Sequence, residues 1–166
     1  AVAAEAAQGE ACAAANDNAP GQIVVSGTKA AVERAMALAK EKGAKRAVLL
    51  PVSAPFHCSL MAPAAEVMEE ALSAVAMNDP AVPLIANVTA DVVTDAKTAR
   101  GLLIAQVTGR VRWRECVLAM KAHGVTALVE VGAGKVLSGL ARRIDRDLTS
   151  AALGTPETIE AFLESL

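Results

Sequence analysis

The apolar positions of this chain follow two patterns that alternate along its length. A three- or four-residue spacing is typical of amphipathic helices, and a short β-branched run is typical of strands. The first pattern predicts helices over residues 1–8, 28–42, 60–76, 94–106, 113–122, 135–145 and from 155 onward. The second predicts strands over residues 22–27, 45–52, 82–88, 126–131 and 148–153, with a weaker candidate over 10–15. This alternation predicts an α/β protein with a largely parallel sheet.

Two segments carry more specific expectations. Residues 16–21, Asn-Asp-Asn-Ala-Pro-Gly, predict a loop, because Asn, Asp, Pro and Gly each favour turn geometry. Residues 47–50, Ala-Val-Leu-Leu, do not alternate, so their strand is expected to be buried on both faces. The first third of the chain holds two strands and a helix with little else, which suggests a smaller appended unit.

Composition and charge exclude several classes of protein. The 166 residues carry a net charge of −2 with both signs interspersed and only 2% aromatic residues, which argues against nucleic-acid binding. Cys12, Cys58 and Cys116 are widely spaced, which predicts reduced thiols in a cytoplasmic protein and no metal site. The longest uncharged stretch, residues 47–65, contains three prolines, so no membrane span is predicted. Because the sequence begins without Met inside a helical pattern, we expect it to be a piece of something longer.

His57 is the first candidate for chemistry, because it follows a predicted strand and precedes a predicted helix. Ligand sites of open α/β sheets lie at the carboxyl ends of strands, and a neutral imidazole can act as a general base near neutral pH. The alternative is a helix-start histidine that bonds a nearby backbone group. No nucleophile is evident: Ser53 and Ser59 lack the Gly-x-Ser-x-Gly context, and Cys58 is expected to point away from His57.

Other polar motifs have simpler interpretations. Residues 132–135, Gly-Ala-Gly-Lys, lack the Gly and the Ser or Thr that a phosphate loop requires at positions 129 and 136, so a tight turn is expected. Gln106 by itself predicts a surface or capping residue, and Trp113 a core anchor. The pair Lys45 and Arg46 is typical of a solvated face, or of a surface that attracts an acidic partner.

Taken together, several segments resemble the malonyl-CoA:acyl carrier protein transacylases of type II fatty acid synthesis. They are residues 16–22 (NDNAPGQ), 43–46 (GAKR), 52–61 (VSAPFHCSLM), Gln106 with 111–113 (VRW), and 129–140 (VEVGAGKVLSGL). Their order and the spacing between His57 and Gln106 match the family over nearly the whole chain, as the C-terminal half of such an enzyme.

The resemblance implies a catalytic serine and histidine. In the family a serine takes the malonyl group from malonyl-CoA as an ester, and a histidine acts as base and then acid. The malonyl group then passes to the phosphopantetheine thiol of acyl carrier protein. His57 matches that histidine, and Gln106 matches the residue whose backbone carbonyl orients it. No cofactor is implied beyond the two substrates, and the full-length enzyme is expected to be a cytoplasmic monomer.

The resemblance also implies a division of the chain and further contacts. Residues 1–53 would be an incomplete ferredoxin-like small subdomain lacking its first strand, and residues 54–166 the C-terminal part of a large α/β-hydrolase-like acyltransferase domain. Asn18 and Gln22 would face the active-site groove as substrate contacts, and Lys45 and Arg46 would dock the acidic carrier protein. A bulky Phe56 would favour malonyl over methylmalonyl groups, although simple core packing explains it equally well.

The sequence departs from the family in one large respect. The family's Gly-His-Ser-x-Gly elbow, its malonate-binding arginine and its Gln-rich oxyanion segment have no counterpart here. The chain is therefore expected to lack transferase activity by itself and to fold poorly alone. Two alternatives remain: a non-catalytic module that binds acyl carrier protein, and an acyltransferase domain of a polyketide synthase.

Overall fold

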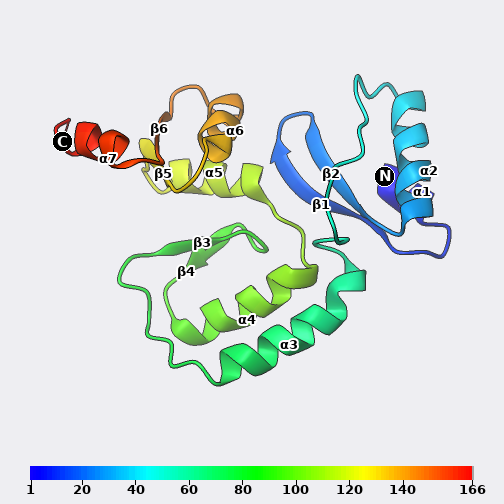
Figure 1. Ribbon diagram of the computed structural model, residues 1–166, viewed down its shortest axis with the longest axis horizontal. Coiled ribbons are helices and arrows are strands. Elements are labelled where there is room, and N and C mark those ends of the chain that lie inside the picture. The colour runs from blue at the N-terminus through cyan, green and yellow to red at the C-terminus, as the bar shows by residue number, and fades with distance from the viewer. Residues whose placement is uncertain (166) are drawn as a thin grey trace.

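A computed structural model describes residues 1–165 as a mixed α/β arrangement (Figure 1). The N-terminal elements are α1 (Val2–Ala7), β1 (Cys12–Ala19), β2 (Gln22–Gly27) and α2 (Lys29–Glu41). The middle elements are a 3₁₀ turn η1 (Ser59–Met61), α3 (Ala62–Ser73), β3 (Leu84–Ala86), β4 (Asp91–Val93) and α4 (Ala96–Thr108). The C-terminal elements are α5 (Trp113–Ala122), β5 (Ala127–Val131), α6 (Val136–Ile144), β6 (Thr149–Leu153) and α7 (Pro156–Leu163).

The N-terminal unit is an antiparallel β1–β2 hairpin with α1 and α2 packed together beside it (Figure 1). Thr28 caps α2 as predicted, because its side chain accepts a hydrogen bond from Ala31 N. Ala6, Ala31 and Ala35 are buried, and such small side chains let backbones approach closely.

The predicted loop over residues 16–21 is wrong. β1 continues through Ala19, and only Pro20 and Gly21 form the turn. Two register shifts, between Ala14 and Asn16 and between Asp17 and Ala19, fit these polar residues into the hairpin. Pairing with β2 therefore outweighs the turn preference of Asn and Asp.

The predicted strand over residues 45–52 is also wrong, because this segment has no strand partner among the described residues. Its apolar side chains, expected to be buried, are open to solvent: Leu49 is 64% exposed and Val52 is 60% exposed. A strand needs a neighbour for its backbone groups, and burial on both faces needs covering layers.

The middle unit packs α3 against α4, with the β3–β4 hairpin between α4 and α5 (Figure 1). The predicted helix over 60–76 is observed as η1 followed by α3, and Pro63 lies in the first turn of α3. The predicted strand over 82–88 is shorter, and its partner β4 was not predicted. Asp95 caps α4 by accepting a hydrogen bond from Thr98 N.

The C-terminal unit contains β5 and β6, the one parallel pair among the described strands. The described strands form three separate two-stranded sheets, so the expectation of a largely parallel sheet is not met within residues 1–165. Glu130 on β5 accepts hydrogen bonds from Leu137 N and Ser138 N at the start of α6. Within the described residues, no helix has the length and apolar character needed to cross a membrane.

Candidate active site

His57 lies in the segment that leads into η1, and its backbone is left-handed with a φ of 58°. This conformation is uncommon for a residue with a Cβ and is found preferentially at functional positions. The neighbouring Cys58 is buried, and its thiol donates a hydrogen bond to Pro55 O at 3.1 Å. The buried cysteine thus anchors the segment that presents the partly buried imidazole.

The ring of His57 meets the end of α4. His57 Nδ1 lies 3.0 Å from the backbone oxygen of Gln106, two residues before the last residue of that helix. The last four carbonyls of a helix lack intrahelical partners and carry the negative end of its dipole. They therefore favour a donor, so Nδ1 carries the proton and the lone pair of neutral imidazole is on Nε2.

Gln106 also fixes its own backbone. Its side-chain Nε2 donates to Gly109 O at 2.9 Å and so ties the last turn of α4 to the chain that follows. Gly109 is required at this close approach, because a Cβ there would meet Val88 Cγ2 at 2.6 Å and Ala105 O at 2.7 Å. The Gln106 side-chain hydrogen bond and the close packing at Gly109 therefore both hold the Gln106 carbonyl that faces His57.

No nucleophile accompanies this pair within residues 1–165. The described hydrogen bonds place no Ser, Thr or Cys side chain on the His57 ring. Ser53 and Ser59, the nearest serines in sequence, are both exposed. The same residues contain no cluster of three His, Cys, Asp or Glu side chains that could hold a metal ion.

The remaining predicted site residues lie in three places. Asn18, on β1, and Gln22, at the start of β2, are half-buried, and Gln22 Oε1 accepts a hydrogen bond from Arg143 on α6. Lys45 and Arg46 are exposed in the loop after α2. Phe56 precedes His57 and is 45% exposed, so core packing within the described chain does not account for it.

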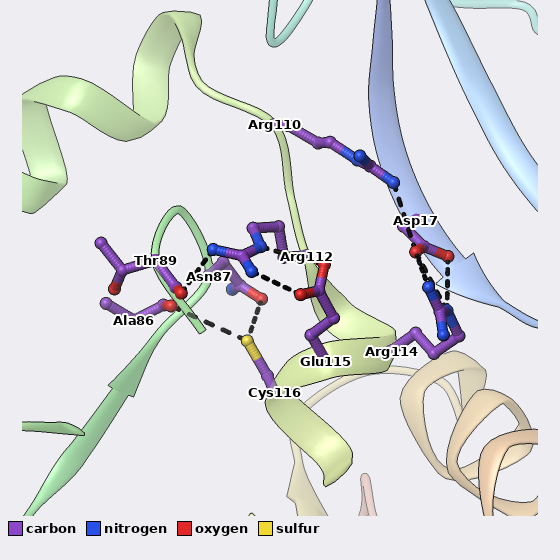
Figure 2. Close-up of polar contacts among 9 residues, drawn as sticks. All are labelled: Asp17, Ala86, Asn87, Thr89, Arg110, Arg112, Arg114, Glu115 and Cys116. Atoms are coloured by element: carbon purple, nitrogen blue, oxygen red, sulfur yellow. Dashed lines mark hydrogen bonds and ion pairs between the residues drawn. The ribbon is translucent and has the colours of Figure 1, made fainter. Parts of the chain in front are cut away.

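An ion cluster that the sequence did not reveal joins β1 to the α4–α5 connection and the first turn of α5 (Figure 2). Asp17 is 2% exposed and accepts hydrogen bonds from Arg114 Nη2 at 2.7 Å and from Arg110 Nη2 at 3.2 Å. The hydrogen bonds from Arg114 lower the pKa of Asp17 below its usual range. Backbone bonds, from Asp17 N to Val111 O and from Val111 N to Ala15 O, reinforce the junction.

A second cluster lies on the other side of the same segment (Figure 2). Arg112 pairs with Glu115, and its Nη1 donates to Thr89 O at 2.6 Å. Cys116 is buried beneath them against Asn87, and burial raises the pKa of its thiol to about 11. A thiol with that pKa is un-ionised at neutral pH, so the role of Cys116 is structural and not nucleophilic.

Comparisons with known proteins show what this chain is similar to. No family model matches the chain. It is 50% identical over 152 residues to the malonyl CoA-acyl carrier protein transacylase of Bacillus subtilis, and 46% identical over 160 residues to that of Escherichia coli K12. Those alignments cover 92% and 96% of this chain but 48% and 52% of the relatives.

Solved structures give the same relationship. The acyl-carrier-protein S-malonyltransferase of Bartonella henselae is 53% identical with a TM-score of 0.93, over 99% of this chain and 52% of that one. A malonyl-transacylase solved in complex with a type II PKS acyl-carrier protein has 39% identity and a TM-score of 0.95, over 99% of this chain and 53% of that one. This chain is a homologue of the malonyl CoA-acyl carrier protein transacylases. It spans about half their length.

The Asp17 cluster connects the β1–β2 hairpin to the chain that follows Gln106. Sequence reasoning missed it because Asp17 falls in the stretch that was predicted to be a loop. Arg110 and Arg114 are four residues apart, but spacing alone does not identify a buried carboxylate 93 residues or more away.

Proposed function

We propose that this chain supplies the general base of a malonyl transfer from malonyl-CoA to acyl carrier protein. The observation that carries the proposal is the His57 ring, oriented by the backbone oxygen of Gln106 at 3.0 Å. A histidine bonded through Nδ1 to a fixed acceptor keeps Nε2 as a base, which is the nucleophile, base and orienter arrangement of acyl-transfer enzymes.

In the proposed reaction, His57 Nε2 takes the proton of a serine hydroxyl as that oxygen attacks the malonyl thioester. The C–S bond breaks, and the imidazolium returns the proton to the departing CoA sulfur. The phosphopantetheine thiol then loses its proton to His57 and attacks the malonyl-serine ester. The serine oxygen leaves and regains the proton, so His57 ends each half-reaction neutral.

The serine would come from the half of the transacylase fold that this chain does not span. No Ser, Thr or Cys side chain bonds the His57 ring within the described residues, and the chain aligns with only 48% to 52% of its curated relatives. The chain by itself is therefore proposed to be inactive.

The similarity to the transacylases also supports proposals for substrate and carrier contacts. Asn18 and Gln22 are proposed to contact the substrate, with Gln22 held by Arg143. Lys45 and Arg46 are exposed and are proposed to attract the acidic carrier protein. Reversal of both charges to Glu should raise KM for acyl carrier protein and leave KM for malonyl-CoA unchanged; equal effects on both constants would remove this assignment.

The test uses a chimera in which these residues replace the matching half of the Bacillus subtilis relative, so that both halves lie in one polypeptide. Transfer of radiolabelled malonyl groups from malonyl-CoA to phosphopantetheinylated acyl carrier protein is measured for the chimera and for this chain alone. The proposal predicts an active chimera and an inactive chain. A folded, inactive chimera would contradict the proposal and favour a non-catalytic carrier-binding module. Turnover by the chain alone would show that it carries a nucleophile of its own, which the proposal denies.

A further inference from the structure

Asp17 is buried to a degree that is rare for a charged residue. Its side chain is 2% exposed, whereas the side chains of its partners Arg110 and Arg114 are 42% and 38% exposed. Burying a carboxylate costs free energy, and a well-packed apolar replacement for a buried ion pair often leaves a protein equally stable. Stability alone therefore does not account for Asp17, and its contacts show what else the carboxylate does.

Arg114 holds the carboxylate through two nitrogens. Arg114 Nε lies 3.1 Å from Asp17 Oδ1, and Arg114 Nη2 lies 2.7 Å from Asp17 Oδ2. A contact through two nitrogens of one guanidinium fixes orientation as well as distance, which a contact between two point charges does not. Arg110 Nη2 adds a longer contact of 3.2 Å, so Arg114 is the main partner. The ion cluster thus sets the direction in which β1 meets α5 (Figure 2).

The segment held by this cluster is the one that ends at the His57–Gln106 pair. Arg110 directly follows Gly109, whose backbone oxygen accepts the hydrogen bond of the Gln106 side chain. Val111 forms two backbone hydrogen bonds of 2.8 Å with β1, one through its nitrogen and one through its oxygen. The α4–α5 connection is therefore bonded to the residue that orients His57 at one end and to β1 at the other.

Asn18 follows Asp17 directly and is the extra residue of a β-bulge. The pairing with β2 passes from Asp17 and Ile23 to Ala19 and Gln22, so Asn18 lies opposite no residue of that strand. Bulges re-aim a side chain and are frequent next to active sites. Asp17 and the fully buried Ala19 are anchored on either side, so these two anchors set the direction of the half-buried Asn18 side chain.

We propose that Asp17 is a positioning residue for substrate binding: its ion pair with Arg114 holds β1 against α5 so that the Asn18 amide meets the bound malonyl-CoA. Asp17 itself touches neither the substrate nor the reacting atoms. The inference rests on the proposed function and on the proposed Asn18 contact. Because the Gln106 side chain holds its own carbonyl in place, loss of the ion pair should weaken malonyl-CoA binding and leave the orientation of His57 unchanged.

A double-mutant cycle in the chimera tests this role. KM for malonyl-CoA and kcat are measured for the parent, for Asp17→Asn, for Asn18→Ala and for the variant that carries both changes. We expect each single change to raise KM by about fivefold or more, the worth of one hydrogen bond, with kcat within about threefold of the parent. The double variant should have the KM of Asn18→Ala. Multiplied increases in KM would overturn the proposal, because Asp17 would then act independently of Asn18, and so would an unchanged KM in Asp17→Asn.

Glu5→Gln is the matched control. It removes a carboxylate from the same N-terminal unit, where Glu5 on α1 pairs with Lys42 at the end of α2. Its KM for malonyl-CoA should stay within about twofold of the parent, because exposed ion pairs contribute little. Equal increases in KM for Glu5→Gln and Asp17→Asn would contradict the proposal, since general loosening of the unit would then explain both. Circular dichroism confirms that each variant is folded under the assay conditions.

A binding measurement separates this inference from the proposed chemistry. The same cycle is repeated in a His57→Ala chimera, with the dissociation constant of malonyl-CoA determined by isothermal titration calorimetry. The dissociation constants should follow the pattern expected for KM, and multiplied effects would again overturn the role of Asp17. A parent chimera that transfers no malonyl groups would refute the proposed function, and the dissociation constants would still decide whether Asp17 acts through Asn18.

Discussion

His57 and Gln106 lie 49 residues apart in sequence, and the imidazole Nδ1 of one lies 3.0 Å from the backbone oxygen of the other. That oxygen is available because Gln106 lies in the last turn of α4, where the helix no longer uses its carbonyls. The pairing thus depends on where a helix ends more than on which side chain stands at position 106. Each variant is made in the chimera that joins these residues to the other half of the Bacillus subtilis relative.

Gln106→Ala keeps the carbonyl but removes the side-chain bond to Gly109 O. We expect a loss of about 1 kcal/mol in the free energy of unfolding, the worth of an ordinary hydrogen bond. We expect kcat to fall less than about tenfold, a barrier change below about 1.4 kcal/mol. Urea denaturation and steady-state kinetics measure the two quantities. A kcat as low as that of a His57 variant would show that the amide side chain itself takes part in the reaction.

Gly109→Ala tests the end of α4 directly. Its new Cβ would meet Ala105 O at 2.7 Å, so the last turn must shift, and overpacking of this kind costs about 1–3 kcal/mol. The shift moves the Gln106 carbonyl, so kcat should fall as well. Gly101→Ala is the matched control in the same helix, where an added Cβ meets nothing within 4 Å. Gly101→Ala should stabilise the fold by about 0.5–1 kcal/mol without altering kcat. A Gly109→Ala variant more stable than Gly101→Ala would contradict the close packing at Gly109.

Arg114→Ala should destabilise the fold more than Asp17→Asn. Removing Arg114 leaves a buried carboxylate with only the longer contact to Arg110, and breaking a buried ion pair costs about 3–5 kcal/mol. Removing the charge of Asp17 leaves two partly exposed arginines that water can solvate, so the cost should be nearer about 1–2 kcal/mol. Urea unfolding at pH 7 orders the two variants, and equal costs would contradict the burial of Asp17.

The same aspartate predicts a dependence on pH. Because Arg114 lowers the pKa of Asp17 in the folded protein, its ionisation stabilises the fold above the ordinary value of 3.8. That stability is lost as the pH falls from 3.8 through the lower folded pKa. Urea midpoints at pH 6 and pH 3 should therefore differ less for Asp17→Asn than for the parent. An identical decline in both proteins would show that other carboxyl groups account for it.

Phe56 tests acyl selectivity. Its exposed ring adjoins His57, where its bulk would crowd an α-methyl group by about 1–3 kcal/mol. Phe56→Ser should therefore raise kcat/KM for methylmalonyl-CoA relative to malonyl-CoA by about tenfold or more. Competition between the two labelled thioesters measures the ratio, and unchanged selectivity would dismiss the idea.

Local signals in the sequence located most helices. Thr28, Asp95 and the capping box at Thr155 mark helix starts in the structure, as capping chemistry leads one to expect. Helical spacing also located α5 and α6. These features depend on residues within a few positions of one another, which is why single-sequence patterns capture them.

The errors concern long-range pairing. Asp17 lies in β1 because β2 and the arginines of the α4–α5 region hold it there, which no turn propensity can indicate. Residues 45–52 have the pattern of a buried strand, but no neighbour pairs with them in the described chain. For the candidate site, the family motif brought His57 and Gln106 together as a hypothesis; the reason, a free carbonyl at a helix end, became visible only in the structure.

The most direct test is the rate of malonyl transfer by the chimera that carries His57→Ala. The control is His123→Ala, which changes the only other histidine of the chain, at the C-terminal end of α5. Loss of a general base should lower kcat by about 10²-fold or more, whereas the control should keep its rate within about twofold. Circular dichroism confirms that both variants are folded. If His57→Ala retains the rate of the parent chimera, the His57–Gln106 pair is structural, and the proposed chemistry is wrong.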